Sequence, residues 1–544
     1  MNDILIIKIN KLNNTASITR SPKATGNILI PKFFIQENIK YKVISIGSYA
    51  FENCSIDSLT FPDDSEIEVF EKDCFNNAHI NKLQIPSKVS KIDGCFSIIK
   101  NLQKIEISPN NQNFILFNDQ LLLGKSNNEV NKFDVLHFAL FDVTETTIPS
   151  QISIIKDYSF YQHEKLTSVK FELNSELRII ESGAFSHTKI ESLIFPASVE
   201  MIGNKSFSNT PHLKSVRFPT NSKLKKILSA FSKSNITNIS LPASVEYIDD
   251  SCFASTPNLC KIEISKDNKF FKSIDGDYIV KENNKGSGVF DVIFIARRNI
   301  ENIIVPNEIK IINRLAFDDC KQLKGIMFEI GSSLELIQSF SFRSISAEKL
   351  MFPPSLKEVG VQSFSFNENL KLVEFLSDSI KINDSCFDEC KKISTIVFLD
   401  ADEIVFENKA MFGIPDNTKI IVKKNCHISG DGLESCKSKI HYFESNFNVN
   451  DANKVENEKK EEVIENKKEK PTPEEILVDE LFNKPDFSIK NIKEYPPEEV
   501  FVTPEILEES IQNKKLSNVD IAFTIYQIVE GMKYIHHRKI IHRD

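Results

Sequence analysis

The sequence contains no tryptophan and no long apolar run, and what it lacks excludes several classes of protein. Its 544 residues include no Trp and only 6 Met. No run of about eighteen apolar residues occurs, so we expect no membrane-spanning helix. The first residues carry Asp3 and only a short apolar run before Lys8, which is not the pattern of a secretory signal peptide. Basic residues (67) are fewer than acidic ones (76), which argues against a general nucleic-acid binder.

Phenylalanine, in contrast, is abundant (42 residues) and recurs within one motif. Residues 190–209, IESLIFPASVEMIGNKSFSN, contain an apolar triplet, a proline, a small polar turn, an apolar pair, and Phe207 after a small residue. Neighbouring copies are mostly 21 to 25 residues apart, for example 207 − 185 = 22, a period typical of leucine-rich repeats. The recurring positions are Phe51, Phe75, Phe96, Phe160, Phe185, Phe207, Phe231, Phe253, Phe317, Phe342, Phe364 and Phe387, with Met411 as a degenerate copy.

One repeat predicts one coil of a solenoid. Alternate side chains of a strand point to opposite faces, so Leu193 and Phe195 should point inward and Ile194 outward. Val199, Met201 or Ile202, and Phe207 should fill the interior from the other side. A single coil cannot bury its own apolar faces, so stability must come from stacking. We therefore predict a curved parallel sheet along one face, with the Phe-bearing turns behind it.

Two gaps in the Phe series are longer and equal, 160 − 96 = 64 and 317 − 253 = 64. Both begin with related segments, NLQKIEIS and NLCKIEIS, and both contain two apolar runs separated by a polar turn. This pattern predicts β-hairpin inserts at about 108–145 and 265–300. The spacings that follow each gap also correspond, which predicts a duplicated unit of about 157 residues.

Seven of the ten cysteines occupy small positions of the repeat, which does not indicate a disulfide framework. Four directly precede a recurring Phe, where other copies have Ala or Ser, and three follow one by three residues: Cys74, Cys95, Cys252 and Cys386, and then Cys54, Cys320 and Cys390. These positions favour buried, reduced thiols that act as small hydrophobes. We therefore expect a cytoplasmic setting.

The repeat resembles the BspA-like (Treponema-type) leucine-rich repeats. Clear copies are LPASVEYIDDSCFASTPNLCKIEI (241–264) and FPPSLKEVGVQSFSFNENLKLVEF (352–375), and the resemblance covers roughly 25–425. It implies a β-rich α/β fold: a leucine-rich-repeat solenoid of parallel strands with short helical or 3-10 turns. The family resemblance also implies protein–protein contact or adhesion, often at microbial or protist surfaces. We expect capping strands over 1–24 and the solenoid over 25–445.

The outward positions of the strands are the candidate binding surface. They include Lys170 and Arg217 in the middle of the chain and a more apolar group later on. A row of exposed apolar residues is unusual and favours a protein-binding strip. Alternatively, the later residues support adjacent strands or are covered by the tail. The candidates are Lys170, Ile194, Arg217, Met327, Met351, Glu374 and Val397.

The composition changes after the solenoid. Residues 446–497 are densely charged and predict a solvated linker. In 498–544, apolar residues recur at helical spacing: Ile521, Ile525, Ile528, Met532 and Ile535. The lead-in IYQIVEGMKYIHHRKII and the final His542-Arg543-Asp544 resemble the eukaryotic protein kinase family up to its catalytic loop. That resemblance implies Asp544 as the proton acceptor, Arg543 as a partner of activation-loop phosphate, and His542 as a structural member.

The rest of a kinase is not recognisable. We find no Gly-x-Gly-x-x-Gly loop, no strand lysine and no Asp-Phe-Gly motif, so ATP and Mg²⁺ would be cofactors only if a complete kinase domain exists. Cys426, His427, Cys436 and His441 are suitable zinc ligands by type, but their spacing is unusual, and packing in a capping region is the favoured interpretation. We predict no cofactor and no metal in this chain.

The leading hypothesis is a protein–protein interaction scaffold, acting in signalling and not catalytic as given. The first alternative is the N-terminal part of a leucine-rich-repeat serine/threonine protein kinase. The second is a surface adhesin without a leader sequence, which would place the protein at the cell surface. We expect protein partners on the strand face, no nucleic acid and no membrane span.

Overall fold

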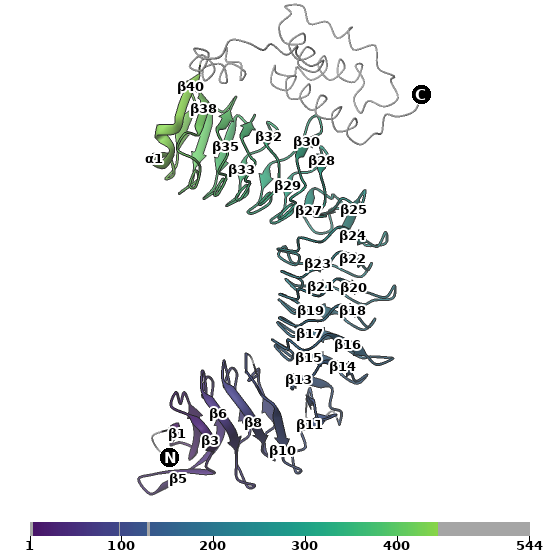
Figure 1. Ribbon diagram of the computed structural model, residues 1–544, viewed down its shortest axis with the longest axis vertical. Helices are drawn as coiled ribbons and strands as arrows, with labels where there is room; N and C mark the ends of the chain where they lie inside the picture. Colours follow the sequence, from purple (N-terminus) through teal and green to yellow (C-terminus); the bar gives the residue numbers. More distant parts are fainter. Residues whose placement is uncertain (1–3, 97, 128–130, 444–544) are drawn as a thin grey trace, which may run out of the picture.

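The chain folds into a β-solenoid whose coils stack into an open arch (Figure 1). The computed structural model describes residues 4–96, 98–127 and 131–443. Each coil contributes one strand to each of two parallel layers, which we call the long-strand layer and the short-strand layer. The solenoid prediction is confirmed, but the single parallel sheet expected from the sequence is two layers. No helix within the described ranges is long and apolar enough to cross a bilayer.

The N-terminal end of the solenoid is closed by paired strands. The first two strands are antiparallel, and the fifth pairs with the second and fourth. This pairing covers the first coil, so the core does not end at an open face. The strands are β1 (Ile6–Asn10), β2 (Thr15–Thr19), β3 (Thr25–Leu29), β4 (Phe33–Gln36) and β5 (Ile39–Ile46).

The long-strand layer is formed by the apolar triplets of the repeat and begins with β3. Its further strands are β6 (Ser55–Thr60), β8 (His79–Ile85), β10 (Lys104–Ile107), β14 (Glu145–Ile148), β16 (Ser168–Phe171), β18 (Ser192–Ile194), β20 (Ser215–Arg217), β22 (Asn238–Leu241), β24 (Lys261–Ile264), β28 (Asn302–Val305), β30 (Gly325–Phe328), β32 (Lys349–Phe352), β34 (Leu372–Phe375), β36 (Thr395–Phe398), β38 (Lys419–Lys423) and β40 (Ile440–Phe443).

The short-strand layer is formed by the apolar pair that follows the proline and continues from β5. Its further strands are β7 (Val69–Phe70), β9 (Lys91–Ile92), β13 (Val135–Ala139), β15 (Ile154–Ile155), β17 (Ile179–Ile180), β19 (Met201–Ile202), β21 (Lys226–Ile227), β23 (Tyr247–Ile248), β27 (Val292–Ala296), β29 (Ile311–Ile312), β31 (Leu336–Ile337), β33 (Glu358–Val359), β35 (Ser379–Ile382), β37 (Glu403–Phe406) and β39 (His427–Ser429).

The coil of residues 190–209 shows how one repeat is built. Leu193 and Phe195 are buried and Ile194 between them is 67% exposed, as side-chain alternation requires. After Pro196 the chain turns, and Val199 and Ile202 return to the interior, where both are fully buried. The second strand exists because Gly203 donates its N–H to the carbonyl of Ile180 at 2.7 Å. A two-residue strand is too short to show period-two alternation in the sequence.

The Phe-bearing turns are stacked turns rather than the short helices expected from the sequence. Phe207 donates its N–H to the carbonyl of Ala230 in the next coil at 2.9 Å, so these turns are hydrogen-bonded between coils. The rings themselves stack, with centroids 5.1 Å apart for Phe185 and Phe207 and 5.6 Å apart for Phe207 and Phe231. Among the described residues, helix is confined to α1 (Leu433–Cys436) and a 3-10 turn at Lys437–Lys439.

Antiparallel strands occur at both predicted inserts. β11 (Phe114–Phe117) pairs with β12 (Leu121–Gly124), which pairs in turn with β13. β25 (Phe271–Ile274) and β26 (Tyr278–Lys281) do the same before β27. The long-strand layer is interrupted at both places. In Figure 1 the arch changes direction at β11 and at β25, so the inserts separate three straight blocks of coils.

The two inserts and the coils after them are copies related by 157 residues. β11 and β25 begin at 114 and 271 (271 − 114 = 157), and β17 and β31 at 179 and 336 (336 − 179 = 157). The irregularity in strand pairing also recurs, between Leu122 and Leu123 and between Ile279 and Val280. Two buried polar side chains, Asn111 and Asn268, are also 157 residues apart (268 − 111 = 157).

Asn111 and Asn268 are equivalent buried side chains that hydrogen-bond the start of each insert to the coil before it. Asn111 donates to the carbonyls of Pro86 and Val89 and accepts the N–H of Phe114. Asn268 makes the corresponding bonds to Pro242, Val245 and Phe271. Because apolar repeats alone could converge, shared buried hydrogen bonds are stronger support for duplication of one ancestral unit.

Candidate functional site

The outward positions of the long-strand layer form a row within each block of coils. Strand pairing places Ile194 opposite Arg217, Ser240 opposite Glu263, and Glu374 between Met351 and Val397. The structure therefore brings the candidate residues of each block into register. It also adds Thr147, Ile304 and Ile421 to the row, opposite Lys170, Met327 and Val397. The sequence reasoning missed these three because their strands flank the inserts or lack a following Phe.

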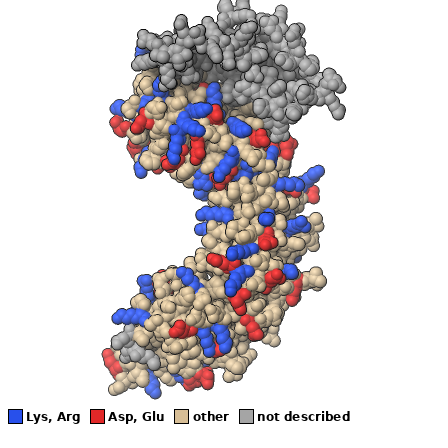
Figure 2. Space-filling model, in the orientation of Figure 1, with Lys and Arg blue, Asp and Glu red and all other residues tan. Residues whose placement is uncertain are grey.

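The middle block presents this row to solvent. Lys170, Ile194 and Arg217 are all exposed. Lysine and arginine side chains project from both edges of the middle coils, interspersed with acids (Figure 2). An exposed isoleucine between two cations is a surface suited to a partner that combines an apolar side chain with carboxylates.

The first block presents a more neutral version of the same row. Lys82 and Lys104 lie 2.8 and 2.7 Å from the carboxylate of Glu106. Hydrogen bonds from Lys104 and Lys82 lower the pKa of Glu106 below its usual value. The two lysines thus have an acidic partner within the row, and exposed pairs of this kind contribute little to stability.

In the last block the outward residues are buried. Met327 is 5% exposed, Val397 1% and Ile421 4%, and Met351 is half-buried. Glu374 in the same row is 6% exposed, and desolvation raises the pKa of its carboxyl, with Lys349 acting in the opposite direction. The sequence reasoning treated this part as an exposed apolar row. These side chains lie at the outward positions of their strands and have little exposed surface.

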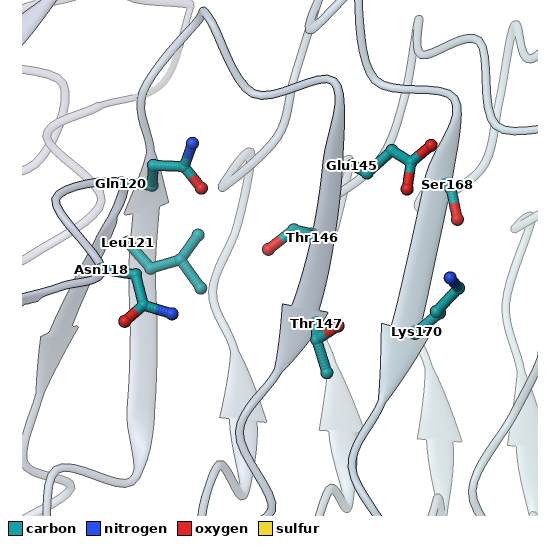
Figure 3. A pocket seen from close by; sticks show the side chains of 8 residues that line it. All are labelled: Asn118, Gln120, Leu121, Glu145, Thr146, Thr147, Ser168 and Lys170. Atoms are coloured by element: carbon teal, nitrogen blue, oxygen red, sulfur yellow. The ribbon is translucent and has the colours of Figure 1, made fainter.

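A polar recess of about 240 Å³ adjoins the start of the middle block. Figure 3 shows Asn118, Gln120 and Leu121 of the first insert on one side and β14 and β16 on the other. The lining is completed by Glu145, Thr146, Thr147, Ser168 and Lys170. On the side away from β16, β14 pairs with no strand of the described ranges, so the recess borders a free strand edge. The amides, hydroxyls and single Glu and Lys offer hydrogen bonds, not a nucleophile with a base.

A second recess of about 330 Å³ lies at the second insert, on the short-strand side. Lys281 and Asn313 both bond the same carboxylate oxygen of Asp250, each at 2.9 Å. These bonds tie the insert to the coils on both sides of it. The polar groups of this recess hydrogen-bond to one another. We therefore interpret the recess as part of the junction between the second insert and its neighbouring coils, which we call the second joint.

The four residues weighed as zinc ligands lie in the last coils. Cys436 is buried, and its thiol contacts the carbonyls of Gly432 and Leu433. Desolvation raises the pKa of Cys426 and of Cys436 to about 11, which disfavours the thiolate that binds metal. His427 and His441 are exposed. Within the described ranges, no three potential His, Cys, Asp or Glu ligands converge.

The kinase-like candidates His542, Arg543 and Asp544 lie outside the described residues, as do the linker 446–497 and the segment 498–544. Their proposed roles stay predictions. The candidate surface of the described chain is therefore the outward row of the long-strand layer together with the adjoining recess.

A solenoid with two parallel strands per coil, stacked Phe turns and an outward-facing row defines a repeat protein of the leucine-rich type. The chain belongs to the BspA type leucine rich repeat family. The family model matches with six copies, over residues 32–119, 131–260 and 290–413. No curated protein matches the sequence.

Several solved bacterial structures are similar to the chain at low identity. The pneumococcal vaccine antigen PcpA is 19% identical, with a TM-score of 0.43, covering 82% of this chain and 96% of PcpA. A leucine rich cell surface protein from Faecalibacterium prausnitzii is 17% identical, with a TM-score of 0.37, covering 82% and 98%. A leucine-rich repeat protein from Eubacterium ventriosum is 14% identical, with a TM-score of 0.40, covering 82% and 94%.

Proposed function

We propose that the protein is a non-catalytic interaction scaffold that binds a protein partner through the long-strand layer of its middle block. The observation that carries the proposal is the exposed row of Lys170, Ile194 and Arg217, which projects from a rigid, fully packed layer. Leu193 and Val216 beneath this row are 2% exposed. A rigid support lowers the entropy lost when a partner binds.

The recess beside β14 extends this surface. An extended segment of the partner can add to the free edge of β14 by main-chain hydrogen bonds. Glu145 and Lys170 then offer charges to its flanking side chains. We therefore expect a partner with an acidic and apolar surface patch and an extended segment at its border.

Site-specific photo-crosslinking tests this proposal in the cells that make the protein. A photoreactive phenylalanine analogue at position 194 should give a discrete crosslinked species, and the crosslink should be lost when Lys170→Glu and Arg217→Glu are added. Tyr247 is the matched control, because it is 47% exposed on the short-strand layer. Equal crosslinking from positions 194 and 247, or persistence after the charge reversals, would refute the proposed face.

We place this scaffold in the reducing cytoplasm, in a signalling role. All ten cysteines are free, and eight of them are buried, which suits a compartment without disulfide formation. The kinase-like sequence after residue 498 supports the signalling role and motivates the alternative of a leucine-rich-repeat kinase. Protease treatment of intact cells distinguishes the other alternative, because a surface adhesin would be cleaved and a cytoplasmic scaffold would not.

A further inference from the structure

The N-terminal cap of the solenoid differs from the rest of the chain in charge. Residues 4–44 contain seven basic residues and one acidic residue, Glu37, although acidic residues outnumber basic ones over the whole chain (76 against 67). Two of the seven, Arg20 and Lys32, are paired with acids of the following coils at 2.7 and 2.6 Å. The other five form no ion pair within the part of the chain that the structure describes: Lys8, Lys11, Lys23, Lys40 and Lys42. The cap therefore carries uncompensated positive charge.

The cap also carries many exposed aliphatic side chains. Of the fifteen large hydrophobic residues that are exposed in the described chain, six lie within residues 4–39. Three of these six lie at or beside turns: Leu12 is 98% exposed, Ile35 60% and Ile39 44%. Single exposed aliphatic residues are ordinary on a protein surface, so the question is whether these three lie together.

Strand pairing brings the two turns that carry them to the same end of the cap. β4 and β5 form an antiparallel hairpin that turns at residues 37–38. β2 runs parallel to β5 with Thr15 beside Lys42, and Lys42 donates its N–H to the carbonyl of Asn14 at 2.9 Å. The turn between β1 and β2, residues 11–14, therefore projects in the same direction as the hairpin. In Figure 1 the hairpin labelled β5 extends beyond the stacked coils at the N-terminal end of the arch.

We call the two turns and the strand residues beside them, 11–14 and 35–42, the cap tip. Lys40 is the cross-strand partner of Ile35 and directly follows Ile39 in the sequence. The first turn has the same combination of a lysine and an adjacent aliphatic residue. The cap tip thus combines exposed apolar side chains with unpaired cations on a projection from the coils.

We propose that the cap tip is a docking site for an anionic membrane surface. Leu12, Ile35 and Ile39 enter the interfacial region of the bilayer, and the neighbouring lysines contact the lipid headgroups. Lysines gain from the negative surface potential of anionic lipids, and aliphatic side chains gain from burial at the boundary between headgroups and acyl chains. This contact is peripheral and places no segment across the bilayer. It concerns the N-terminal cap, so it does not depend on the function proposed for the middle block.

The shape of the cap tip favours a membrane over a folded partner. A protein interface needs a complementary surface with a buried centre. Cross-strand pairing instead puts Ile35 with Lys40 on one face of the hairpin and Ile39 with Gln36 on the other. The interfacial region of a bilayer surrounds an inserted tip on every side, so it needs no such complementarity. A second copy of the chain would bring like charges together, which repel.

Co-sedimentation of the full-length protein with lipid vesicles tests the proposal. Vesicles of phosphatidylcholine and phosphatidylserine in a two-to-one ratio should bind the protein, and vesicles of phosphatidylcholine alone should bind it about tenfold less, because the charge attraction is lost. Leu12→Ser with Ile35→Ser should weaken binding to the anionic vesicles by about tenfold, because the apolar contact is lost. Lys11→Glu with Lys40→Glu should weaken it at least as much. All four side chains are exposed, so the urea unfolding curve should not change.

Matched variants elsewhere on the solenoid are the controls. Leu173→Ser removes an aliphatic side chain that is 90% exposed, and Lys225→Glu with Lys226→Glu reverses two exposed charges of the middle block. Both variants should bind anionic vesicles as the native sequence does. Glu37→Gln removes the one acid of residues 4–44 and should strengthen binding.

A solvent-sensitive fluorophore shows whether the cap tip enters the bilayer interface. The background carries Cys260→Ser and Cys426→Ser, since these are the two cysteines that are not buried. A label on Leu12→Cys should shift to the blue on anionic vesicles, and the same label on Leu173→Cys should not.

Three results would overturn the proposal. The first is binding that survives either pair of cap-tip substitutions. The second is an unshifted label at position 12, or a loss of binding with the lysine variants alone, because either would reduce the contact to charge attraction without insertion. The third is a dimer in lipid-free solution that Leu12→Ser with Ile35→Ser dissociates, which would assign the cap tip to a second copy of the chain.

Discussion

The guanidinium of Arg298 donates a hydrogen bond of 3.2 Å to the carbonyl oxygen of Phe253, across the second insert. The same side chain, which is only 3% exposed, also donates a hydrogen bond of 3.3 Å to the carbonyl oxygen of Ala316. Arg298 therefore joins the last coil of the middle block to the first coil of the last block. The Phe stack, which runs from Phe160 to Phe253 and resumes at Phe317, is bridged here by a polar contact.

At the first insert, aromatic side chains join the two neighbouring blocks of coils. Phe141 is the equivalent of Arg298 (141 + 157 = 298), and it stacks on His163 with ring centroids 4.5 Å apart. Phe96 stacks on Phe138 at 4.8 Å, so the aromatic series continues across this joint. The two joints of one duplicated unit thus differ in chemistry, and they should respond differently to mutation and to pH.

Replacing Arg298 with Met should weaken the second joint. The carbonyls of Phe253 and Ala316 would lose a charged donor within the buried joint, a loss of about 1.5–3 kcal/mol. Because the contact links two blocks, urea unfolding followed by circular dichroism should become biphasic, with residues 317–443 exchanging amide protons sooner. Arg178→Met is the control, because its pair with Glu200 is exposed and should contribute little to stability. A single unshifted transition would contradict the role given to Arg298.

Replacing Phe207 with Ala should destabilise the middle block by about 3–5 kcal/mol, as expected for a buried aromatic truncated to Ala. Phe207 is fully buried and stacks on a ring at each side. The free energy of unfolding from urea titration is the measurement. Leu173→Ala, at a position 90% exposed, is the control and should have little effect. A loss below about 1 kcal/mol for Phe207→Ala would show that the turn interior is not a packed core.

The repeat made the inward positions predictable from the sequence, because a dozen copies identify which residues recur. Leu193, Phe195 and Phe207 are all buried as expected, and the 64-residue gaps located both inserts. The second strand of each coil was not predictable, since two residues such as Met201 and Ile202 carry no periodic signal. The low exposure of Met327 and Val397 was also beyond local pattern, because alternation along a strand gives the face that a residue occupies and not how much of its surface is exposed. Nothing in FDVIFIARR distinguished Arg298, which is buried, from Arg297, which pairs with Asp277.

Thiol counting should find ten free cysteines in the purified protein. In the folded state, Cys260 should react first with iodoacetamide because it is exposed, and Cys426 more slowly because it is partly buried. Desolvation raises the pKa of Cys426 to about 11 and that of Cys390 to about 12, which further slows thiolate formation. Protein alkylated during cell lysis and then denatured should show ten labelled cysteines by mass spectrometry. Fewer than ten would indicate disulfides and count against the cytoplasmic setting.

Acidification should loosen the first joint more than the second. Desolvation lowers the pKa of His163, and it lowers the pKa of His137 to about 3. Both groups keep their usual pKa, about 6.5, in the unfolded chain. Between pH 6.5 and the folded pKa values, the unfolded state therefore binds more protons than the folded state, so stability falls as the pH falls. His137 should reduce the free energy of unfolding by about 1–2 kcal/mol between pH 6.5 and pH 5, and His163 should act in the same direction.

The second copy supplies the matched control for this pH dependence. Its equivalents of His137 and His163 are Phe294 and Cys320 (137 + 157 = 294 and 163 + 157 = 320). The variant His137→Phe with His163→Cys should therefore lose much of the decline toward pH 5, measured relative to its own stability at pH 7. Amide exchange in 135–163 should accelerate at pH 5 in the native sequence, relative to 292–320 after correction for intrinsic rates. If both joints accelerate equally, carboxylate protonation elsewhere controls the acid response and the histidines do not.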